Sequence, residues 1–153
     1  MMRRPLRSVT LTRTPIDAAA LARSVGDPSA GAIVVFEGVT RDVELLRFEA
    51  YEPMALLRMQ AHAEDAVERY ALAGVAIAHR LGDVRLGEAS IVIAVAAGHR
   101  PEGFDGCRFL IDAIKSDVPI WKQEITGAGA NWGRSETDIA SVEASATRGA
   151  RST

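Results

Sequence analysis

The sequence lacks the marks of several protein classes. Its single cysteine, Cys107, excludes an intramolecular disulfide and a metal site made from several cysteines. No apolar run approaches the roughly 20 residues needed to cross a bilayer, and the basic start MMRRPLRSVTLT has no apolar core long enough for a secretory signal. No zinc-binding, phosphate-loop or serine-triad pattern is present. We therefore expect a cytoplasmic protein without a metal site.

An excess of charge of one sign is also lacking. The 18 lysines and arginines nearly balance the 20 aspartates and glutamates, so the net charge is -2 and the basic field typical of general nucleic-acid binding is absent. The chain has 153 residues, 48% hydrophobic and 25% charged, which suits one compact domain with its own core. We expect this domain over residues 1–135 and a flexible tail over residues 136–153, where the chain turns small and polar.

Hydrophobic patterning predicts a mixture of strands and helices. Strands are expected at residues 7–12, 31–38, 47–51, 75–78, 90–97 and 120–125, with a short one inside 81–88. Helices are expected at residues 15–25, 53–72 and 102–115. The first helix would be capped by Thr14, with Pro15 at its first position, and strand 47–51 would pair antiparallel with strand 31–38. These elements indicate an α+β domain with an antiparallel or mixed sheet.

The most informative segment is KSDVPIWKQE, residues 115–124. Pro119 has no N–H and pushes Val118 toward extended backbone, which ends a helix. Lys115 is therefore expected at the end of that helix and Lys122 on the strand that follows. Two ammonium groups brought together either bind an anion or lower one another's pKa. A lysine with a lowered pKa can act as a nucleophile or proton carrier near neutral pH.

Three other places carry candidate ligand groups. His99 and Arg100 lie between an apolar strand and a helix start, where exposed N–H groups favour anions; the alternative is a polar turn. Arg41 follows a strand, and its fork of donors suits phosphate; the alternative is a surface ion pair. Glu124 shares a strand face with Lys122, and either orients that ammonium or is one more surface charge.

Other chemically suggestive residues are assigned to packing. The last predicted helix has an apolar face, with residues spaced three or four apart: Phe104, Cys107, Ile111 and Ile114. Cys107 is therefore expected in buried packing rather than as a reactive thiol. His79 leads into a turn, and a structural role is favoured for it. Trp121 and Trp132 are expected to anchor the core or an interface.

Five segments resemble the large, catalytic subunit of molybdopterin synthase. In order between residues 31 and 132 they read GAIVVFEGVTRD, FEAYEPMA, HRLGDVRLGE, AGHRPEGF and KSDVPIWKQE. The last two are quite specific, and five ordered matches argue against coincidence. One departure is DVELLRFEA, residues 42–50, which is shorter than the hairpin usual in the family and lacks glycine. The resemblance implies an α/β hammerhead-type fold with an additional antiparallel subdomain.

The resemblance also implies an activity, a sulfurtransferase of molybdenum-cofactor biosynthesis. The substrate would be cyclic pyranopterin monophosphate. The sulfur would come from the C-terminal thiocarboxylate on the Gly-Gly tail of a small ubiquitin-like sulfur-carrier subunit, and two transfers would build the dithiolene of molybdopterin. A homodimer with a carrier at each end, a heterotetramer, is implied. Because the carrier supplies the sulfur, no cofactor is expected, and neither nucleic acid nor membrane is an expected partner.

Carried over by position, the resemblance assigns residue roles. Lys115 is the expected catalytic group, and Lys122 is the second active-site lysine. The expected substrate-binding residues are Val39, Thr40, Arg41, His99, Arg100, Lys115, Lys122, Gln123 and Glu124. Fixed cations of this kind stabilise a phosphate and an anionic tetrahedral centre. Two rival hypotheses are a non-catalytic module that binds an acidic peptide tail or phosphorylated ligand, and a Schiff-base lyase or aldolase built on Lys115.

Overall fold

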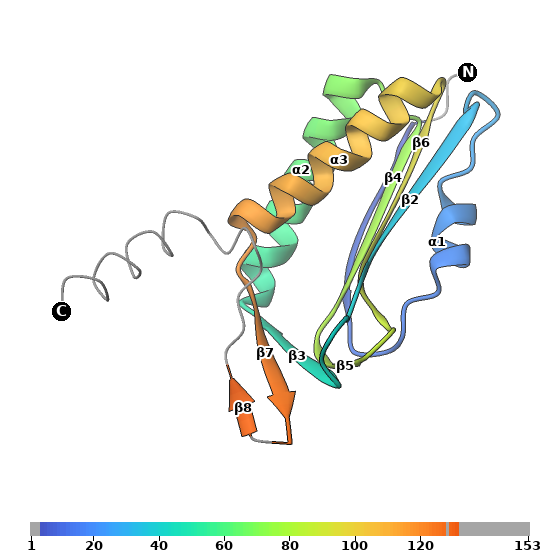
Figure 1. Ribbon diagram of the computed structural model, residues 1–153. Coiled ribbons are helices and arrows are strands. Elements are labelled where there is room, and N and C mark those ends of the chain that lie inside the picture. Colours follow the sequence, from blue (N-terminus) through green and yellow to red (C-terminus); the bar gives the residue numbers. More distant parts are fainter. Residues whose placement is uncertain (1–3, 128, 132–153) are drawn as a thin grey trace, which may run out of the picture.

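The computed structural model describes residues 4–127 and 129–131, which form two sheets and three helices (Figure 1). The expected tail and Trp132 lie outside the described residues. No helix in the described ranges is long and apolar enough to cross a membrane. In chain order the elements are β1 (Leu6–Thr12), α1 (Ala18–Ser24), β2 (Ala32–Val39), β3 (Leu45–Ala50), α2 (Glu52–Tyr70), β4 (Gly74–Arg80), β5 (Gly82–Arg85), β6 (Ala89–Ala97), α3 (Arg100–Asp117), β7 (Ile120–Thr126) and β8 (Gly129–Asn131).

The first sheet has the strand order β1-β4-β6-β2. Strands β1 and β4 are parallel, whereas β4–β6 and β6–β2 are antiparallel. Every residue of the interior strand β4 is buried, as expected for a strand covered on both faces. The mixed first sheet, together with an antiparallel second one, confirms the predicted α+β class.

Helices cover both faces of the first sheet, with α2 and α3 side by side on one face and α1 on the other (Figure 1). The core between the sheet and the paired helices contains Met59, Ile77, Ile93 and Leu110, which are almost fully buried. Each such side chain contributes roughly 1.5–3 kcal/mol through removal of apolar surface from water. This layered core is the rigid support for the rest of the chain.

The face of α3 that packs on the sheet differs from the predicted one. Cys107 is buried, as predicted, but Phe104 is 62% exposed. Small residues hold the helix close to its neighbours: a Cβ on Gly103 would lie 3.1 Å from Val34 Cγ2, and one on Gly106 would lie 3.0 Å from Leu72 Cδ1. Because the glycine side of the helix makes the contact, Phe104 is turned outward.

The start of α1 also corrects the prediction. Its N-cap is Asp17, whose carboxylate accepts a hydrogen bond from the Ala20 N–H at 3.0 Å. The Thr14 N–H instead bonds to the hydroxyl of Thr12 at 3.2 Å, so Thr14 belongs to the turn after β1. Pro15 therefore precedes the helix rather than opening it.

The second sheet is antiparallel, with the order β5-β3-β7-β8. The predicted pairing of β3 with β2 is wrong, because β3 pairs with β5 and β7 instead. The short connection after β2 contains Asp42 at φ 64° and leads the chain out of the first sheet. A similar transfer follows β4, where Gly82 at φ 79° sends the chain into β5. Both transfers place the second sheet at one end of the layered core (Figure 1).

Candidate active site

A cavity of about 460 Å³ lies where the two sheets and the C-terminal part of α3 meet. Its apolar wall comes from both sheets and the helix, and includes Phe36, Phe48, Ile91, Ile114 and Ile120. Polar groups line it as well, and the charged ones are Arg41, Asp42, Lys115, Lys122 and Glu124. The cavity therefore combines apolar walls with three cationic side chains and two carboxylates.

The two lysines reach the cavity from different elements, as the sequence predicts. Lys115 lies in the last turn of α3, where the helix dipole favours a cation. The helix ends at Asp117, and its C-cap residue Val118 has an extended backbone, with φ of -82° and ψ of 126°, as expected before Pro119. Lys122 lies on β7, directly opposite Phe48 of β3. The proline bend thus brings both ammonium groups to the same cavity.

These two residues are the only lysines in the chain, since the other 16 of its 18 basic residues are arginines. Lysine differs from arginine in being able to give up its proton near neutral pH when its surroundings lower its pKa. Both lysines of the chain therefore lie at this cavity, together with Arg41. This count is a further signal in the sequence, beside the segment of residues 115–124.

The last residue of β2, Val39, and Arg41 in the segment that follows both line the cavity. Thr40, between them, does not line it. Its side chain is 2% exposed, and its hydroxyl donates to the Val84 carbonyl at 3.5 Å. Of these three predicted substrate-binding residues, Val39 and Arg41 therefore lie at the cavity, and Thr40 lies in the packed backbone behind it.

Strand β7 divides its predicted residues between two faces. Lys122 and Glu124 line the cavity, in keeping with the two-residue period of a strand. Gln123 and Trp121 alternate with them and do not line it. The Trp121 side chain is 48% exposed, so the prediction of a core anchor is wrong for this residue, and an interface remains the open alternative.

The His99–Arg100 pair is not at this cavity. His99 is the N-cap of α3 and Arg100 is its first residue, whereas Lys115 is in its last turn. At about 1.5 Å per residue, the 15 residues from Arg100 to Lys115 span roughly 22 Å. Pro101 does occupy the start of the helix, as predicted. One chain alone therefore does not bring this pair to the lysines.

His79 is a cavity residue that the sequence interpretation missed. It is 7% exposed, its Nδ1–H donates to the Arg80 carbonyl at 2.7 Å, and its ring meets Phe48 edge-on at 5.2 Å. Burial lowers the His79 pKa to about 4, and the positive charge of Lys115 adds to this effect. The imidazole is therefore neutral at pH 7. Its position directly after the predicted apolar strand of residues 75–78 was the signal that the sequence offered.

Cys107 contributes no reactive sulfur to the cavity. Its side chain is buried under α3 and does not line the cavity wall. Burial raises its pKa to about 11, so the thiol stays protonated at neutral pH. Within the part of the chain that is described, no group of three histidine, cysteine or acidic side chains is placed to hold a metal ion.

Comparison with known proteins identifies close relatives. The chain matches the family described as MoaE protein over residues 11–117. It is 42% identical over 151 residues to a molybdopterin synthase catalytic subunit of Oryza sativa subsp. indica, covering 89% of this chain and 78% of that protein. It is 39% identical over 131 residues to molybdopterin synthase catalytic subunit 1 of Mycobacterium tuberculosis, covering 80% and 87%. The fold is similar to molybdopterin synthase from Staphylococcus aureus, with a TM-score of 0.78, 30% identity and coverage of 82% and 96%.

Proposed function

We propose a sulfur-transfer reaction at the cavity, from the premise that this chain belongs to the family of molybdopterin synthase catalytic subunits. The substrate is cyclic pyranopterin monophosphate and the product is molybdopterin. The sulfur donor is the thiocarboxylate at the Gly-Gly end of a small sulfur-carrier subunit, and the reaction takes place in the cytoplasm. The observation that carries the proposal is the convergence of the chain's only two lysines, with Arg41, on one cavity.

The cations match the charges of such a reaction. The carrier tail brings a thiocarboxylate anion, and the pterin brings a phosphate. As the thiocarboxylate sulfur bonds to the pterin, negative charge develops on the oxygen substituent that leaves. Water then adds to the thioester that joins pterin and carrier, negative charge develops on the oxygen of the tetrahedral carbon, and the C–S bond breaks to leave the sulfur on the pterin and a carboxylate on the carrier. Ammonium groups held beside apolar walls stabilise that charge more strongly than water does, because they are already oriented. We assign this task to Lys115 and Lys122.

Lys115 is the proposed catalytic group. It lines the cavity from the last turn of α3, where the helix end and the proline bend meet the second sheet. It either polarises the thiocarboxylate or moves a proton as the oxygen substituent leaves. Glu124 lines the cavity from the same β7 face as Lys122, and we assign it to orienting that second ammonium.

Arg41 is the proposed phosphate ligand of the same chain, because its planar fork can bind two phosphate oxygens at once. The His99–Arg100 pair needs a different route to the substrate. Since these residues lie at the other end of α3, we assign them to the cavity of a second chain in a homodimer. Each chain would then supply its lysines to one site and its His99–Arg100 turn to the other.

The decisive test is turnover by Lys115 variants with thiocarboxylated carrier and the pterin substrate. Lys115→Ala should fold normally and lose about 10³-fold in rate, as expected for a main stabiliser of developing charge. Lys115→Arg keeps the positive charge but cannot release a proton. An inactive Lys115→Arg protein assigns proton transfer to Lys115, and a largely active one assigns charge stabilisation. Near wild-type rates for Lys115→Ala would reject the catalytic assignment.

The two rival functions give different results in the same assay. A binding module would hold the carrier tail but form no molybdopterin, and Lys115→Ala would only weaken the binding. A Schiff-base enzyme would be trapped by borohydride as an adduct on Lys115. With two lysines in the whole chain, peptide mass mapping would locate such an adduct without ambiguity.

A further inference from the structure

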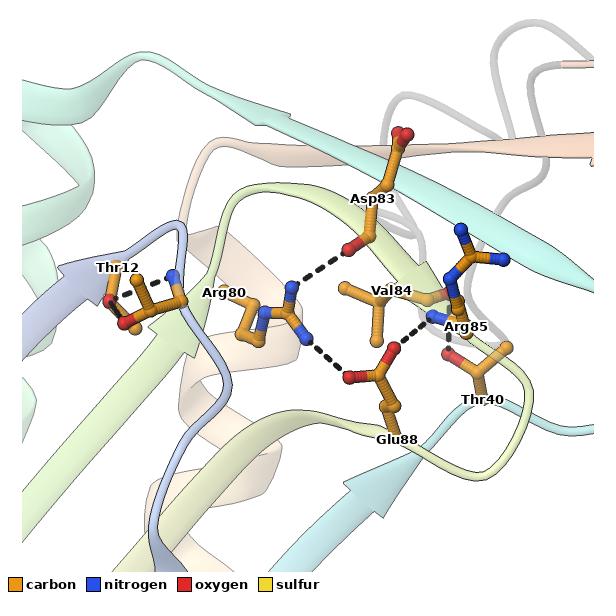
Figure 2. Close-up of polar contacts among 8 residues, drawn as sticks. Thr12, Thr40, Arg80, Asp83, Val84, Arg85 and Glu88 are labelled. Carbon is orange, nitrogen blue, oxygen red and sulfur yellow. Dashed lines mark hydrogen bonds and ion pairs between the residues drawn. The ribbon is translucent and has the colours of Figure 1, made fainter.

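An ion pair between the buried Arg80 and the partly exposed Glu88 lies behind the cavity, on the opposite face of β4 from His79. The Arg80 side chain is 7% exposed and donates through Nη1 to Glu88 Oε2 at 3.1 Å and through Nη2 to the Asp83 carbonyl at 2.8 Å (Figure 2). Among the described residues its Nε lacks a hydrogen-bond partner. We call the Arg80–Glu88 pair and the turn of residues 85–88 the clasp.

Stability alone does not account for this pair. Burying the Arg80 guanidinium costs free energy that the attraction of a carboxylate still 35% exposed recovers only in part. The unpartnered Nε of Arg80 adds to that cost. A charged pair with one buried member can instead hold one local geometry against its alternatives.

The geometry held here is that of the turn after β5. The second carboxylate oxygen of Glu88 accepts the Arg85 N–H at 2.9 Å, and Gly87 closes the turn at φ 85°. This turn also binds both backbone groups of Thr40. The Thr40 N–H donates to the Glu88 carbonyl at 3.0 Å, and the Gly87 N–H donates to the Thr40 carbonyl at 2.9 Å. Figure 2 shows Thr40, Arg85 and Glu88 gathered around this turn.

Thr40 immediately precedes Arg41, which lines the cavity. The far end of the same connection is held by the turn as well, because the Leu86 N–H donates to the Glu44 carbonyl at 2.9 Å. The β2–β6 ladder becomes irregular between Gly38 and Val39, so regular strand pairing ends before Arg41. The clasp is therefore what fixes the backbone on both sides of the cavity arginine.

We propose that Arg80 and Glu88 are positioning residues for Arg41, holding its guanidinium where a phosphorylated substrate binds. The inference rests on the proposed function, since it gives the cavity arginine a phosphate to bind. A pre-positioned arginine binds phosphate more tightly because less backbone and side-chain freedom is lost on binding. The clasp thus acts on substrate affinity and leaves the charge on the lysines unchanged.

The test is steady-state turnover of the pterin substrate by the complex with thiocarboxylated carrier. Glu88→Gln keeps the shape but removes the charge, and should raise KM for the pterin about tenfold with kcat within about twofold of wild type. In an Arg41→Ala background the same change should raise KM no further, because the two residues act as one unit. The double variant Arg80→Met with Glu88→Leu removes the pair without a stranded charge and should show the same rise.

Two control variants separate positioning from a general loss of stability. Asp65→Asn makes the same acid-to-amide change in the exposed Asp65–Arg69 pair of α2 and should leave KM unchanged. Val67→Ala weakens the helical layer of the core, away from the cavity, and should lower thermal stability without altering KM. A KM rise in Val67→Ala equal to that in Glu88→Gln would overturn the proposal.

Amide hydrogen exchange tests the clasp without substrate. Exchange at Thr40 should accelerate about tenfold or more in Glu88→Gln, while exchange at Ile93 in the central sheet stays slow. If the wild type is active but Glu88→Gln leaves KM for the pterin unchanged, the positioning role of the clasp is rejected. The same holds if Glu88→Gln still raises KM in the Arg41→Ala background. Neither result affects the proposed function. A wild-type complex that forms no molybdopterin overturns the proposed function, and with it the phosphate role of Arg41.

Discussion

The two ends of α3 carry similar positive groups but differ in their surroundings. At the C-terminal end, Lys115 meets the second sheet and faces a cavity with Lys122. At the N-terminal end, His99 and Arg100 stand at the positive pole of the helix dipole, and the N-cap residue His99 makes no side-chain cap hydrogen bond. Among the described residues, the cavity therefore forms at the end of α3 that the second sheet closes over. The proposed role of the other end, at the site of a second chain, can be tested.

The largest expected effect is complementation between two inactive chains, which tests whether the two ends of α3 contribute to the same site. Lys115→Ala and Arg100→Ala homodimers should each lose most of their turnover. In a mixed dimer, the lysine of one chain meets the intact arginine of the other at one of two sites. Such mixed dimers, purified with two affinity tags, should recover about half of wild-type turnover.

The control for complementation is a mixed dimer of Lys115→Ala with Lys122→Ala. Both lysines line the cavity of their own chain, so one site of this dimer lacks Lys115 and the other lacks Lys122. It should stay inactive. If the Lys115→Ala and Arg100→Ala dimer is equally inactive, the two ends of α3 do not share a site across the interface.

A smaller effect concerns His79, which is neutral in the folded chain because it is buried beside Lys115. Its folded pKa of about 4 lies below the unfolded value of 6.5, so protonation favours unfolding. The resulting stability is complete above pH 6.5 and is lost as the pH falls toward 4, by about 3 kcal/mol in all. Urea unfolding at several pH values should show this fall in wild type but not in His79→Gln. Parallel curves for the two proteins would contradict the buried, neutral state of His79.

The smallest expected effect is at Cys107. Cys107→Ala removes a buried sulfur from the α3 contact and should cost about 1 kcal/mol of stability. Turnover with thiocarboxylated carrier should stay within about twofold of wild type, since the thiol neither lines the cavity nor ionises at neutral pH. A folded but inactive Cys107→Ala protein would instead point to a sulfur intermediate on this chain.

Local features of the fold were predictable from the sequence. Pro119 dictates the extended backbone of Val118, and the apolar run of β4 and β6 predicts buried strands. The helix caps were less secure, since Thr14 and Asp17 are both good capping residues and the turn after β1 decides between them. Which residue caps a helix depends on contacts only a few residues away, but these contacts are known only once the backbone path is known.

Long-range pairing was not predictable in the same way. The pattern of β3 fits a partner on either sheet, because a half-buried alternating strand has the same signature wherever it pairs. Its observed partners, β5 and β7, come from segments far along the chain. The outward turn of Phe104 has a similar origin, since the glycine face of α3 packs closer to the sheet than the aromatic face can.

By itself, the sequence determined the helix-to-strand bend at Pro119, the placement of lysine at only two positions and the order of the elements, because backbone sterics and local periodicity act between near neighbours. Tertiary structure alone decided that Arg41 and His79 join Lys115 and Lys122 around a cavity, that Thr40 is turned into its support, and that His99 and Arg100 stay apart from it. The reason is that a cavity is the space left between packed sheets and helices, and its shape follows from which strands pair.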